Sequence, residues 1–248
     1  MVSQAMISIT YKDKGIPVYR TCKEEGEPHP ALILIHEVWG LSGHIKDVAN
    51  RLCAEGFEVI APDLLADTDV SKYATPELQK ALFDPEERLK HQVEIRAMMA
   101  PLGAPGFSEE TMEKLEAVFK YLKDQPAVTK IGVIGFCFGG TYGFGLATRE
   151  QGLSAALPFY GHGEQWMDGF KDINCPVMAF YGQKDETLNA HIPEIEKAMQ
   201  SAGKQFRYEV YPGAGHAFFN DTNPLAYNGL AAKDAWTKSL VFLHENLD

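Results

Sequence analysis

The sequence is poor in cysteine and has no close pair of cysteines. Its four cysteines are Cys22, Cys53, Cys137 and Cys175, and no Cys-x-x-Cys motif occurs among its 248 residues. This spacing offers neither a structural zinc site nor a disulfide framework. The first residues also lack a basic stretch followed by an apolar one, so we expect no secretory signal. Free thiols persist in a reducing compartment, and the sequence therefore predicts a cytoplasmic protein.

Basic residues and long apolar runs are scarce as well. The chain has 23 Lys and Arg against 34 Asp and Glu, which gives a net charge of -11. An acidic surface attracts neither nucleic acid nor anionic lipid, so we expect neither as a partner. No apolar stretch approaches the length of a membrane span, and we expect no membrane insertion. The sequence indicates no oligomeric state.

Motifs for cofactors are also missing. Several glycines crowd together at 132–140, but they do not follow the Gly-x-Gly-x-x-Gly spacing of dinucleotide-binding proteins. Gly139-Gly140-Thr141 lacks the lysine of a phosphate-binding loop, and no His-Glu-x-x-His or similar metal motif occurs. We therefore expect no metal ion and no nucleotide cofactor.

The hydrophobic pattern predicts one α/β domain over residues 1–248. Short apolar runs, which predict strands, lie at 31–35, 57–61, 131–135, 155–160, 177–181 and 206–211. Patterns with helical spacing lie between them, at 45–52, 108–122, 192–202 and 233–245. This alternation predicts a mostly parallel sheet with helices on both faces. Alternating residues at 7–11 and 16–19 predict an antiparallel hairpin at the start.

Residues 63–105 interrupt this pattern. They are rich in charge and contain Pro101 and Pro105, which favour helices and loops inserted over the sheet rather than a strand. The next helix is expected to begin with Ser108 as its capping residue, with acids in its first turn.

The stretch 131–140 places Cys137 at the centre of a Gly-x-Cys-x-Gly turn between a predicted strand and a predicted helix. This arrangement is typical of a nucleophile elbow, in which glycines on either side permit a tight crossing. A helix N-terminus also favours a thiolate. Taken alone, the turn leaves open that Cys137 is one more small buried hydrophobe.

A cysteine nucleophile needs a base and an acid that orients the base. His216 lies just past the last predicted strand, where sites form in open α/β sheets. Asp185 follows another strand and stands between nucleophile and base in the chain, although it could also be a turn residue or a helix cap, and Glu186 is a weaker candidate. Four other histidines are expected to be solvated or structural, namely His29, His44, His91 and His244, while His36 and His162 remain candidate pocket residues.

Glu37 follows the apolar strand at 31–35 and should face the same site. A carboxylate beside a thiol can accept or hold its proton if burial raises the carboxyl pKa, whereas an ordinary surface glutamate would do neither. We expect the backbone N–H groups of Val38 and Phe138 to form the oxyanion hole. Four aromatic or imidazole side chains near strand ends are expected to form pocket walls, namely Trp39, Tyr160, His162 and Phe218.

Taken together, these motifs resemble the dienelactone hydrolases (carboxymethylenebutenolidases), a family with the α/β-hydrolase fold. The resemblance implies that Cys137 attacks a lactone or ester carbonyl, that His216 acts as base and acid, that Asp185 orients His216, and that Glu37 holds and activates the thiol. Members acting on dienelactone place an arginine four residues after the catalytic histidine, where this chain has Asn220. Arg88 or Arg96 of the inserted segment could supply a cation instead.

The leading hypothesis is a cofactor-free cysteine hydrolase that opens a small-molecule lactone or ester through a thioester acyl-enzyme. An alternative with the same residues is a carboxylesterase or thioesterase whose substrate lacks the dienelactone carboxylate. A second alternative is a non-catalytic relative that binds ligands or senses oxidants, since a fold alone does not establish an activity.

Overall fold

A central eight-stranded sheet organises the protein in a computed structural model that describes residues 3–22 and 27–248. The strands are β1 (Ser3–Tyr11), β2 (Lys14–Cys22), β3 (His29–Ile35), β4 (Glu58–Pro62), β5 (Val128–Phe136), β6 (Leu153–Phe159), β7 (Val177–Gly182) and β8 (Phe206–Tyr211). Their spatial order is β1-β2-β4-β3-β5-β6-β7-β8. Strands β1 and β2 form the predicted antiparallel hairpin, β2 pairs antiparallel with β4, and the remaining pairs are parallel.

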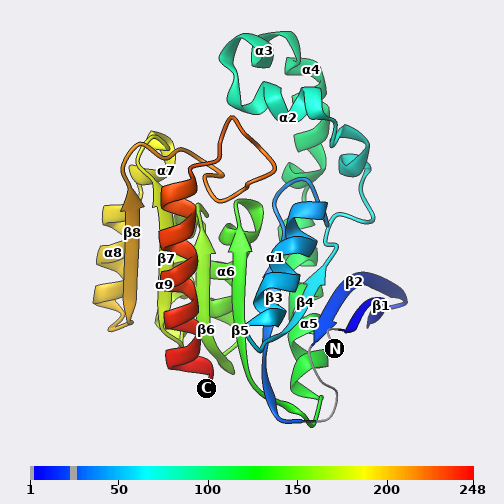
Figure 1. Cartoon of the computed structure of the whole chain (residues 1–248), viewed down its shortest axis with the longest axis vertical. Helices are drawn as coiled ribbons and strands as arrows, with labels where there is room; N and C mark the ends of the chain where they lie inside the picture. Colours follow the sequence, from blue (N-terminus) through cyan, green and yellow to red (C-terminus); the bar gives the residue numbers. More distant parts are fainter. Residues whose placement is uncertain (1–2, 23–26) are drawn as a thin grey trace.

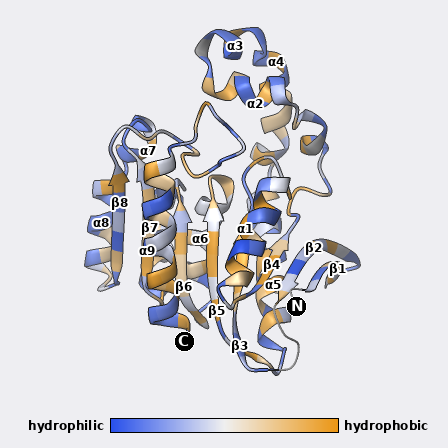
Figure 2. Ribbon diagram, in the orientation of Figure 1, coloured by the Kyte–Doolittle hydropathy of each residue, from blue (hydrophilic) through white to orange (hydrophobic). Residues whose placement is uncertain are grey.

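Helices cover both faces of the sheet, as the alternating pattern predicts. In Figure 1, α1 (Gly43–Ala54) and α9 (Gly229–Leu247) lie in front of the sheet, and α5 (Phe107–Lys123) and α6 (Phe138–Arg149) lie behind it. The short helices α7 (Glu186–Asn189) and α8 (Ile192–Ser201) and the 3-10 segment η3 (Gly163–Asp172) complete the layers. The inner strands are strongly apolar (Figure 2), and most of their residues are buried between the helices, as expected for parallel strands with both faces covered.

The expectation that Ser108 caps α5 is wrong. The helix begins one residue earlier, at Phe107, and its N-cap is Gly106 with a φ of 83°. Glycine adopts this left-handed backbone without a Cβ clash, which lets the chain turn into the helix, and no side chain caps the first turn. Glu109 and Glu110 do lie in the first turn, where acids favour the positive end of the helix dipole.

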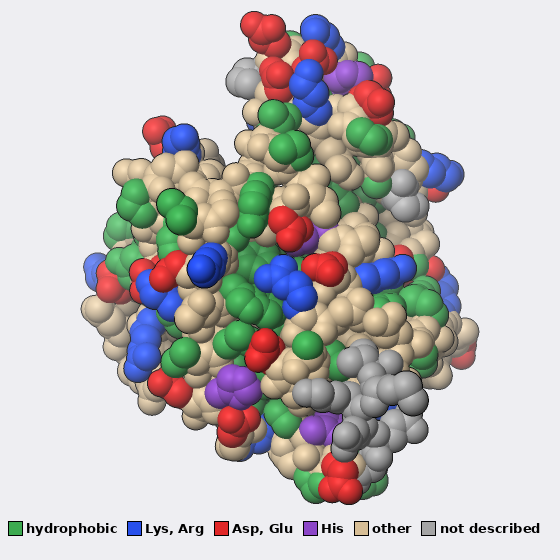
Figure 3. Space-filling model, in the orientation of Figure 1, with side chains coloured by type: hydrophobic (Ala, Val, Ile, Leu, Met, Phe, Trp, Pro, Cys, Tyr) green, Lys and Arg blue, Asp and Glu red, His purple; other side chains and the backbone are tan. Residues whose placement is uncertain are grey.

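Residues 63–105 form a group of short helices above the carboxyl ends of the strands (Figure 1). The helical segments are η1 (Asp69–Tyr73), α2 (Pro76–Phe83), α3 (Pro85–Lys90), α4 (Gln92–Met99) and η2 (Ala100–Gly103). We call these residues the cap. Buried Val70, Leu78 and Met98 anchor it to the body, whereas charged side chains gather on its outer surface (Figure 3). Within the two described stretches, no helix is long and apolar enough to cross a membrane.

Candidate active site

Cys137 lies at the sharp turn between β5 and α6, as the glycine-flanked motif predicts. Its backbone has φ 55° and ψ -111°, a conformation that residues other than glycine rarely adopt. Only three other described non-glycine residues have positive φ, and two of them, Tyr160 and Ala217, also lie at this site. Backbone strain of this kind persists where the surrounding structure enforces it, and it is concentrated at functional sites. The turn therefore presents Cys137 as a nucleophile elbow would.

Two glycines allow the turn to lie against the ends of neighbouring strands. A Cβ on Gly139 would overlap the carbonyl oxygen of Ile35, and a Cβ on Gly140 would overlap that of Phe159. The N–H of Gly139 instead donates to the carbonyl oxygen of His36 at 3.0 Å, and the N–H of Cys137 donates to that of Phe159, also at 3.0 Å. These contacts fix the elbow between β3 and β6.

The structure brings His216 and Asp185 together. Nδ1 of His216 lies 2.5 Å from Oδ2 of Asp185, and both residues lie in loops at the carboxyl ends of strands. Burial alone would lower the pKa of His216, but attraction to the Cys137 sulfur and the hydrogen bond to Asp185 outweigh it and raise the pKa to about 10. Burial also raises the pKa of Asp185, but the hydrogen bond to His216 and the charge of that ring together outweigh burial and leave the pKa below its usual value. The arrangement therefore favours an imidazolium beside the sulfur.

Glu37 is buried with only 2% of its surface exposed, so the alternative that it is an ordinary surface glutamate is wrong. Its Oε2 accepts a hydrogen bond of 2.7 Å from Nδ2 of Asn220. Burial raises the pKa of the Glu37 carboxyl, while the charges of His44 and His216 and the Asn220 amide oppose that rise. The hydroxyl of Tyr160 is also buried near this carboxylate, and burial followed by the Glu37 charge raises the tyrosine pKa well above its usual value.

The two histidines left open by the sequence have different surroundings. His36 is fully buried, with Nδ1 2.6 Å from the carbonyl oxygen of Glu37 and Nε2 accepting from the N–H of Leu64 at 3.0 Å. Burial lowers its pKa, which keeps the ring neutral and structural. His162 reaches the cleft beside Cys137, and its Nδ1 lies 2.7 Å from Oε1 of Glu164.

A cleft of about 490 Å³ lies over Cys137 and His216. The cleft is lined by five further residues that the sequence placed at the site, namely Val38, Phe138, Tyr160, His162 and Arg88. The sequence did not indicate its other lining residues, Met99, Leu102, Phe107, Thr141, Tyr142 and Gln165, because most lie on helices whose apolar pattern is also that of core residues.

Two expected pocket walls do not line the cleft. Phe218 is fully buried and packs against Tyr160, with ring centroids 5.5 Å apart, and against Tyr211 at 5.1 Å. Trp39 lies in the turn after Glu37 and packs against the core. Phe218 thus packs behind the ring of Tyr160. The expectation that Phe218 forms a wall of the substrate pocket is wrong.

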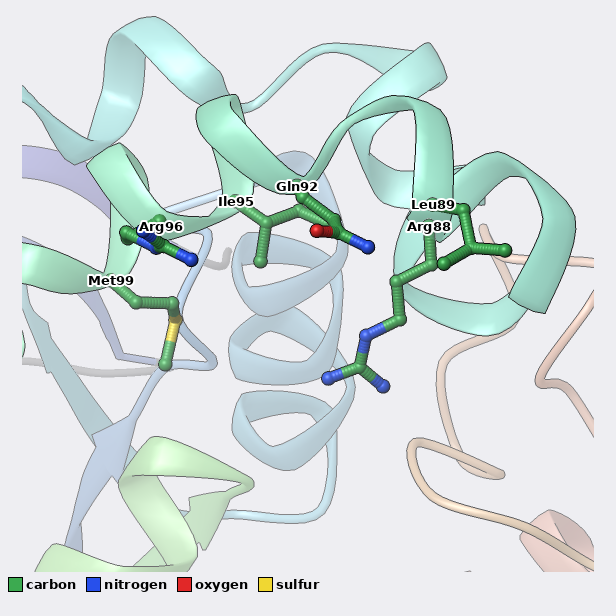
Figure 4. Close-up of a pocket in the computed structure, with 6 residues that line it drawn as sticks. All are labelled: Arg88, Leu89, Gln92, Ile95, Arg96 and Met99. Atoms are coloured by element: carbon green, nitrogen blue, oxygen red, sulfur yellow. The ribbon is translucent and has the colours of Figure 1, made fainter.

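A second cleft of about 450 Å³ lies beneath the cap. Figure 4 shows its lining side chains, Arg88, Leu89, Gln92, Ile95, Arg96 and Met99, all from α3 and α4. Arg88 and Met99 line both clefts, so the two spaces adjoin. The guanidinium of Arg88 extends away from the cap ribbon in Figure 4. Among residues 3–22 and 27–248, no His, Cys, Asp or Glu side chains form a group suited to a metal ion.

Comparisons with known proteins identify the family of the chain and agree with its fold. The model of the dienelactone hydrolase family matches residues 16–247. A provisionally assigned carboxymethylenebutenolidase of Saccharolobus solfataricus is 31% identical over 251 residues, covering 95% of this chain and 96% of that protein.

Solved structures support the fold. A provisionally named dienelactone hydrolase from Klebsiella pneumoniae has a TM-score of 0.82 at 24% identity and covers 99% of both chains. The acylaminoacyl peptidase of Pyrococcus horikoshii has a TM-score of 0.67 at 12% identity, covering 99% of this chain and 42% of the peptidase. The predicted α/β-hydrolase fold is thereby confirmed, and the chain belongs to the dienelactone hydrolase family.

Proposed function

We propose that the protein is a cysteine hydrolase that opens a lactone or ester through a thioester acyl-enzyme on Cys137. Membership of the dienelactone hydrolase family supports lactone or ester hydrolysis. The observation that carries the cysteine mechanism is the strained Cys137 beside a histidine that an aspartate holds at 2.5 Å. These three residues match the roles of nucleophile, base and orienting acid.

In the acylation half, the Cys137 thiolate attacks the carbonyl carbon and His216 carries the proton. The new C–S bond sends the carbonyl electrons to oxygen, which forms a tetrahedral oxyanion. When this collapses, the C–O bond to the leaving oxygen breaks, and the imidazolium of His216 gives its proton to that oxygen. Asp185 holds the ring in the orientation that this transfer needs. For a lactone, the released hydroxyl stays on the acyl group.

In the deacylation half, water attacks the thioester. His216 takes a proton from that water as the new C–O bond forms, and collapse of the second oxyanion breaks the C–S bond. The products are the carboxylic acid and the Cys137 thiolate, with the imidazolium restored. Water is the only further reagent that these steps require.

We assign the oxyanion hole to the backbone N–H groups of Val38 and Phe138. Phe138 is the first residue of α6, and the first turn of a helix leaves N–H groups unpaired within the helix. The next N–H, from Gly139, already donates to His36. Val38 lies in the turn after β3, and both residues line the cleft. Donors from two loops can therefore converge on one oxygen.

We propose that Glu37 is the second group that controls the charge at Cys137. Burial raises the pKa of its carboxyl, which therefore keeps a proton to a higher pH than an exposed glutamate does. The hydroxyl of Tyr160 lies within electrostatic reach of both Glu37 and Cys137. In this proposal Glu37 acts on the thiol in addition to the Asp185–His216 pair.

The substrate class has two candidates. Arg88 lines the catalytic cleft and favours a lactone or ester that carries a carboxylate. Asn220 stands at the position of the arginine in dienelactone-specific members, and its amide already donates to Glu37. This favours a neutral carboxylic ester or thioester as substrate.

We propose that Tyr160 and His162 form cleft walls, and that the chain is one cytoplasmic domain with residues 63–105 as its cap.

A burst experiment tests the nucleophile. With p-nitrophenyl acetate, the protein should release one equivalent of p-nitrophenol per site before steady turnover. Cys137→Ala should abolish the burst and reduce turnover by about 10³-fold or more, whereas Cys175→Ala, which changes a buried cysteine outside the cleft, should retain both. A burst that persists in Cys137→Ala would refute the mechanism. Alkylation of Cys137 in a protein without esterase activity would instead support a redox or binding role.

A further inference from the structure

The loop after β6 lies directly against the nucleophile elbow. A Cβ on Gly161 would overlap the backbone of Gly140, so the absence of side chains at these two glycines lets the loop approach α6 closely. The next residue, His162, donates its backbone N–H to Oγ1 of Thr141 at 2.9 Å. The N–H of Thr141 in turn donates to the carbonyl oxygen of Cys137 at 3.0 Å. These contacts hold His162 at a fixed place relative to the nucleophile.

The imidazole of His162 has one nitrogen held by the protein and one left over. Nδ1 lies 2.7 Å from Oε1 of Glu164, which is the only side-chain hydrogen bond of Glu164 among residues 3–22 and 27–248. Nε2 forms no hydrogen bond with any residue in those two stretches. The contact with Glu164 fixes the orientation of the ring. In every protonation state of the ring, Nε2 can therefore either accept or donate one further hydrogen bond.

His162 lines the cleft of about 490 Å³ that contains Cys137 and His216. Its side chain is 39% exposed, whereas that of Glu164 is only 17% exposed, so the imidazole is the part of the pair that substrate can reach. Much of the remaining lining is apolar or aromatic, from Met99, Leu102, Phe107, Phe138 and Tyr142. A polar substrate group beside the ring would gain a hydrogen bond to Nε2, whereas an apolar group there would exclude water and leave Nε2 without a partner.

A hydroxyl is the substrate group that fits Nε2 in every state of the ring, because a hydroxyl both donates and accepts. The proposed reaction also generates this group, since opening a lactone leaves a hydroxyl on the acyl chain bound to Cys137. We propose that His162, oriented by Glu164, binds a hydroxyl on the acyl part of the substrate, so that the site selects hydroxyacyl esters over plain acyl esters. The inference rests on the proposed function, which places the acyl group on Cys137 in this cleft.

Pairs of esters that differ only by a hydroxyl in place of a methyl group test this selection. Methyl γ-hydroxybutyrate is compared with methyl valerate, and methyl β-hydroxybutyrate with methyl isovalerate. Acid release at constant pH gives kcat/KM for each ester. The ratio within a pair is divided by the same ratio for hydroxide-catalysed hydrolysis, which removes the effect of the hydroxyl on the carbonyl itself. The unchanged protein should prefer the hydroxy ester of at least one pair by about fivefold to tenfold, as expected for one hydrogen bond.

His162→Asn is the decisive variant. Its amide can donate to Glu164 as Nδ1 does, but it is too short to place an atom where Nε2 lies. The corrected ratio should fall to about one, and any general effect on turnover cancels within a pair of esters. Glu164→Ala, which leaves the ring unheld, should lower the ratio by a smaller factor. His191→Asn is the matched control, because His191 also faces a glutamate, Glu194, at 3.8 Å and is also 39% exposed, but lies outside the cleft. Its ratio should equal that of the unchanged protein.

The inference is overturned if the unchanged protein prefers neither hydroxy ester, or if the preference persists in His162→Asn. If that variant does not fold, His162→Phe, which keeps a ring without nitrogen, decides in its place. An unchanged ratio in Glu164→Ala refutes the positioning role of Glu164.

Failure of the proposed function gives a different result. Turnover without a burst refutes the thioester on Cys137 and still leaves the ratio measurable. If no ester is turned over, NMR of the histidine ring nitrogens decides, with the His162 signals identified by their loss in His162→Asn. Methyl γ-hydroxybutyrate or methyl β-hydroxybutyrate should then shift the Nε2 signal of His162 more than its methyl counterpart does, and equal shifts refute the inference.

Discussion

The N–H of Gly139 donates to the carbonyl oxygen of His36 at 3.0 Å, which ties the turn that carries Cys137 to the loop that carries Glu37. The bond requires α6 to begin directly against the end of β3, where a Cβ on Gly139 would overlap the carbonyl oxygen of Ile35. The positions of two candidate catalytic side chains thus depend on the absence of one methyl group.

Gly139→Ala is therefore expected to destabilise the protein by about 3 kcal/mol or more, since backbone rather than a flexible side chain blocks the new methyl. At Gly143, one turn later in the same helix, a Cβ would meet no atom of another element within 4 Å. Gly143→Ala should stabilise the protein by about 0.5–1 kcal/mol because alanine favours a helix. Urea unfolding of both variants measures the contrast, and equal effects would contradict it.

Alkylation should distinguish Cys137 from the other three cysteines. Cys137 is partly exposed, whereas Cys22, Cys53 and Cys175 are buried. Burial also raises the pKa of Cys175 to about 12, so its thiolate is scarce at pH 8. Iodoacetamide at pH 8 should modify one cysteine per chain, identified by peptide mass as Cys137. Faster modification of any buried cysteine would show that the structure opens more readily than its packing indicates.

The pKa of His216 should depend on Cys137. Attraction to the sulfur helps hold this pKa at about 10, and the opposing effect of burial remains if the sulfur is removed. In Cys137→Ser, the uncharged hydroxyl should let the pKa fall toward the ordinary histidine value of about 6.5. NMR titration of the ring nitrogens measures the shift, with Cys175→Ala as control. A pKa that stays near 10 in Cys137→Ser would assign the shift to Asp185 alone.

Local patterns were sufficient to predict the strands of the sheet, the hairpin and the elbow, because each of these is formed by residues close in sequence. Apolar runs mark strands that are buried on both faces, and glycines flank Cys137 because the crossing has no room for Cβ atoms. The structure also brings together His216 and Asp185, whose places at strand ends follow from the order of the motifs.

Partners far apart in the sequence could not be predicted in the same way. Asn220 lies 183 positions from Glu37, and His44 lies 177 from Asp221, so no periodicity connects them. His44 has the sequence context of a structural histidine at a helix start, and only the folded structure shows that its Nδ1 lies 3.2 Å from Oδ1 of Asp221. Phe218 was misassigned for the converse reason, because proximity to His216 in sequence does not decide which way a side chain points.

Asn220→Ala should cost about 1–3 kcal/mol of unfolding free energy, since it leaves a buried carboxylate without its donor. The Asn220 amide lowers the pKa of Glu37 by favouring the charged form. The loss should therefore grow as pH rises through that pKa and shrink in acid, where the carboxyl keeps its proton. Asn246→Ala is the control, since its amide donates to a helix carbonyl. Urea unfolding at several pH values measures the trend, and a pH-independent loss would contradict it.

Arg88→Gln should separate the two candidate substrate classes. Arg88 lines both the catalytic cleft and the cleft under the cap, so an anionic group on a bound ester can reach it. Losing that charge-assisted contact should reduce kcat/KM for a carboxylate-bearing ester by about tenfold and leave a neutral ester of the same length within about twofold. The difference should diminish at high salt, because part of the attraction is screened.

Lys90→Gln is the matched control for Arg88→Gln. Lys90 lies on the same helix but pairs with Glu87 at 3.0 Å and lines neither cleft. It should change kcat/KM little for either ester, so any general effect of removing one positive charge from the cap is accounted for. Equal losses on both esters in Arg88→Gln would show that the arginine supports the cap rather than the substrate. No loss on either would favour a neutral ester or thioester, because Asn220 already donates to Glu37 and supplies no positive charge.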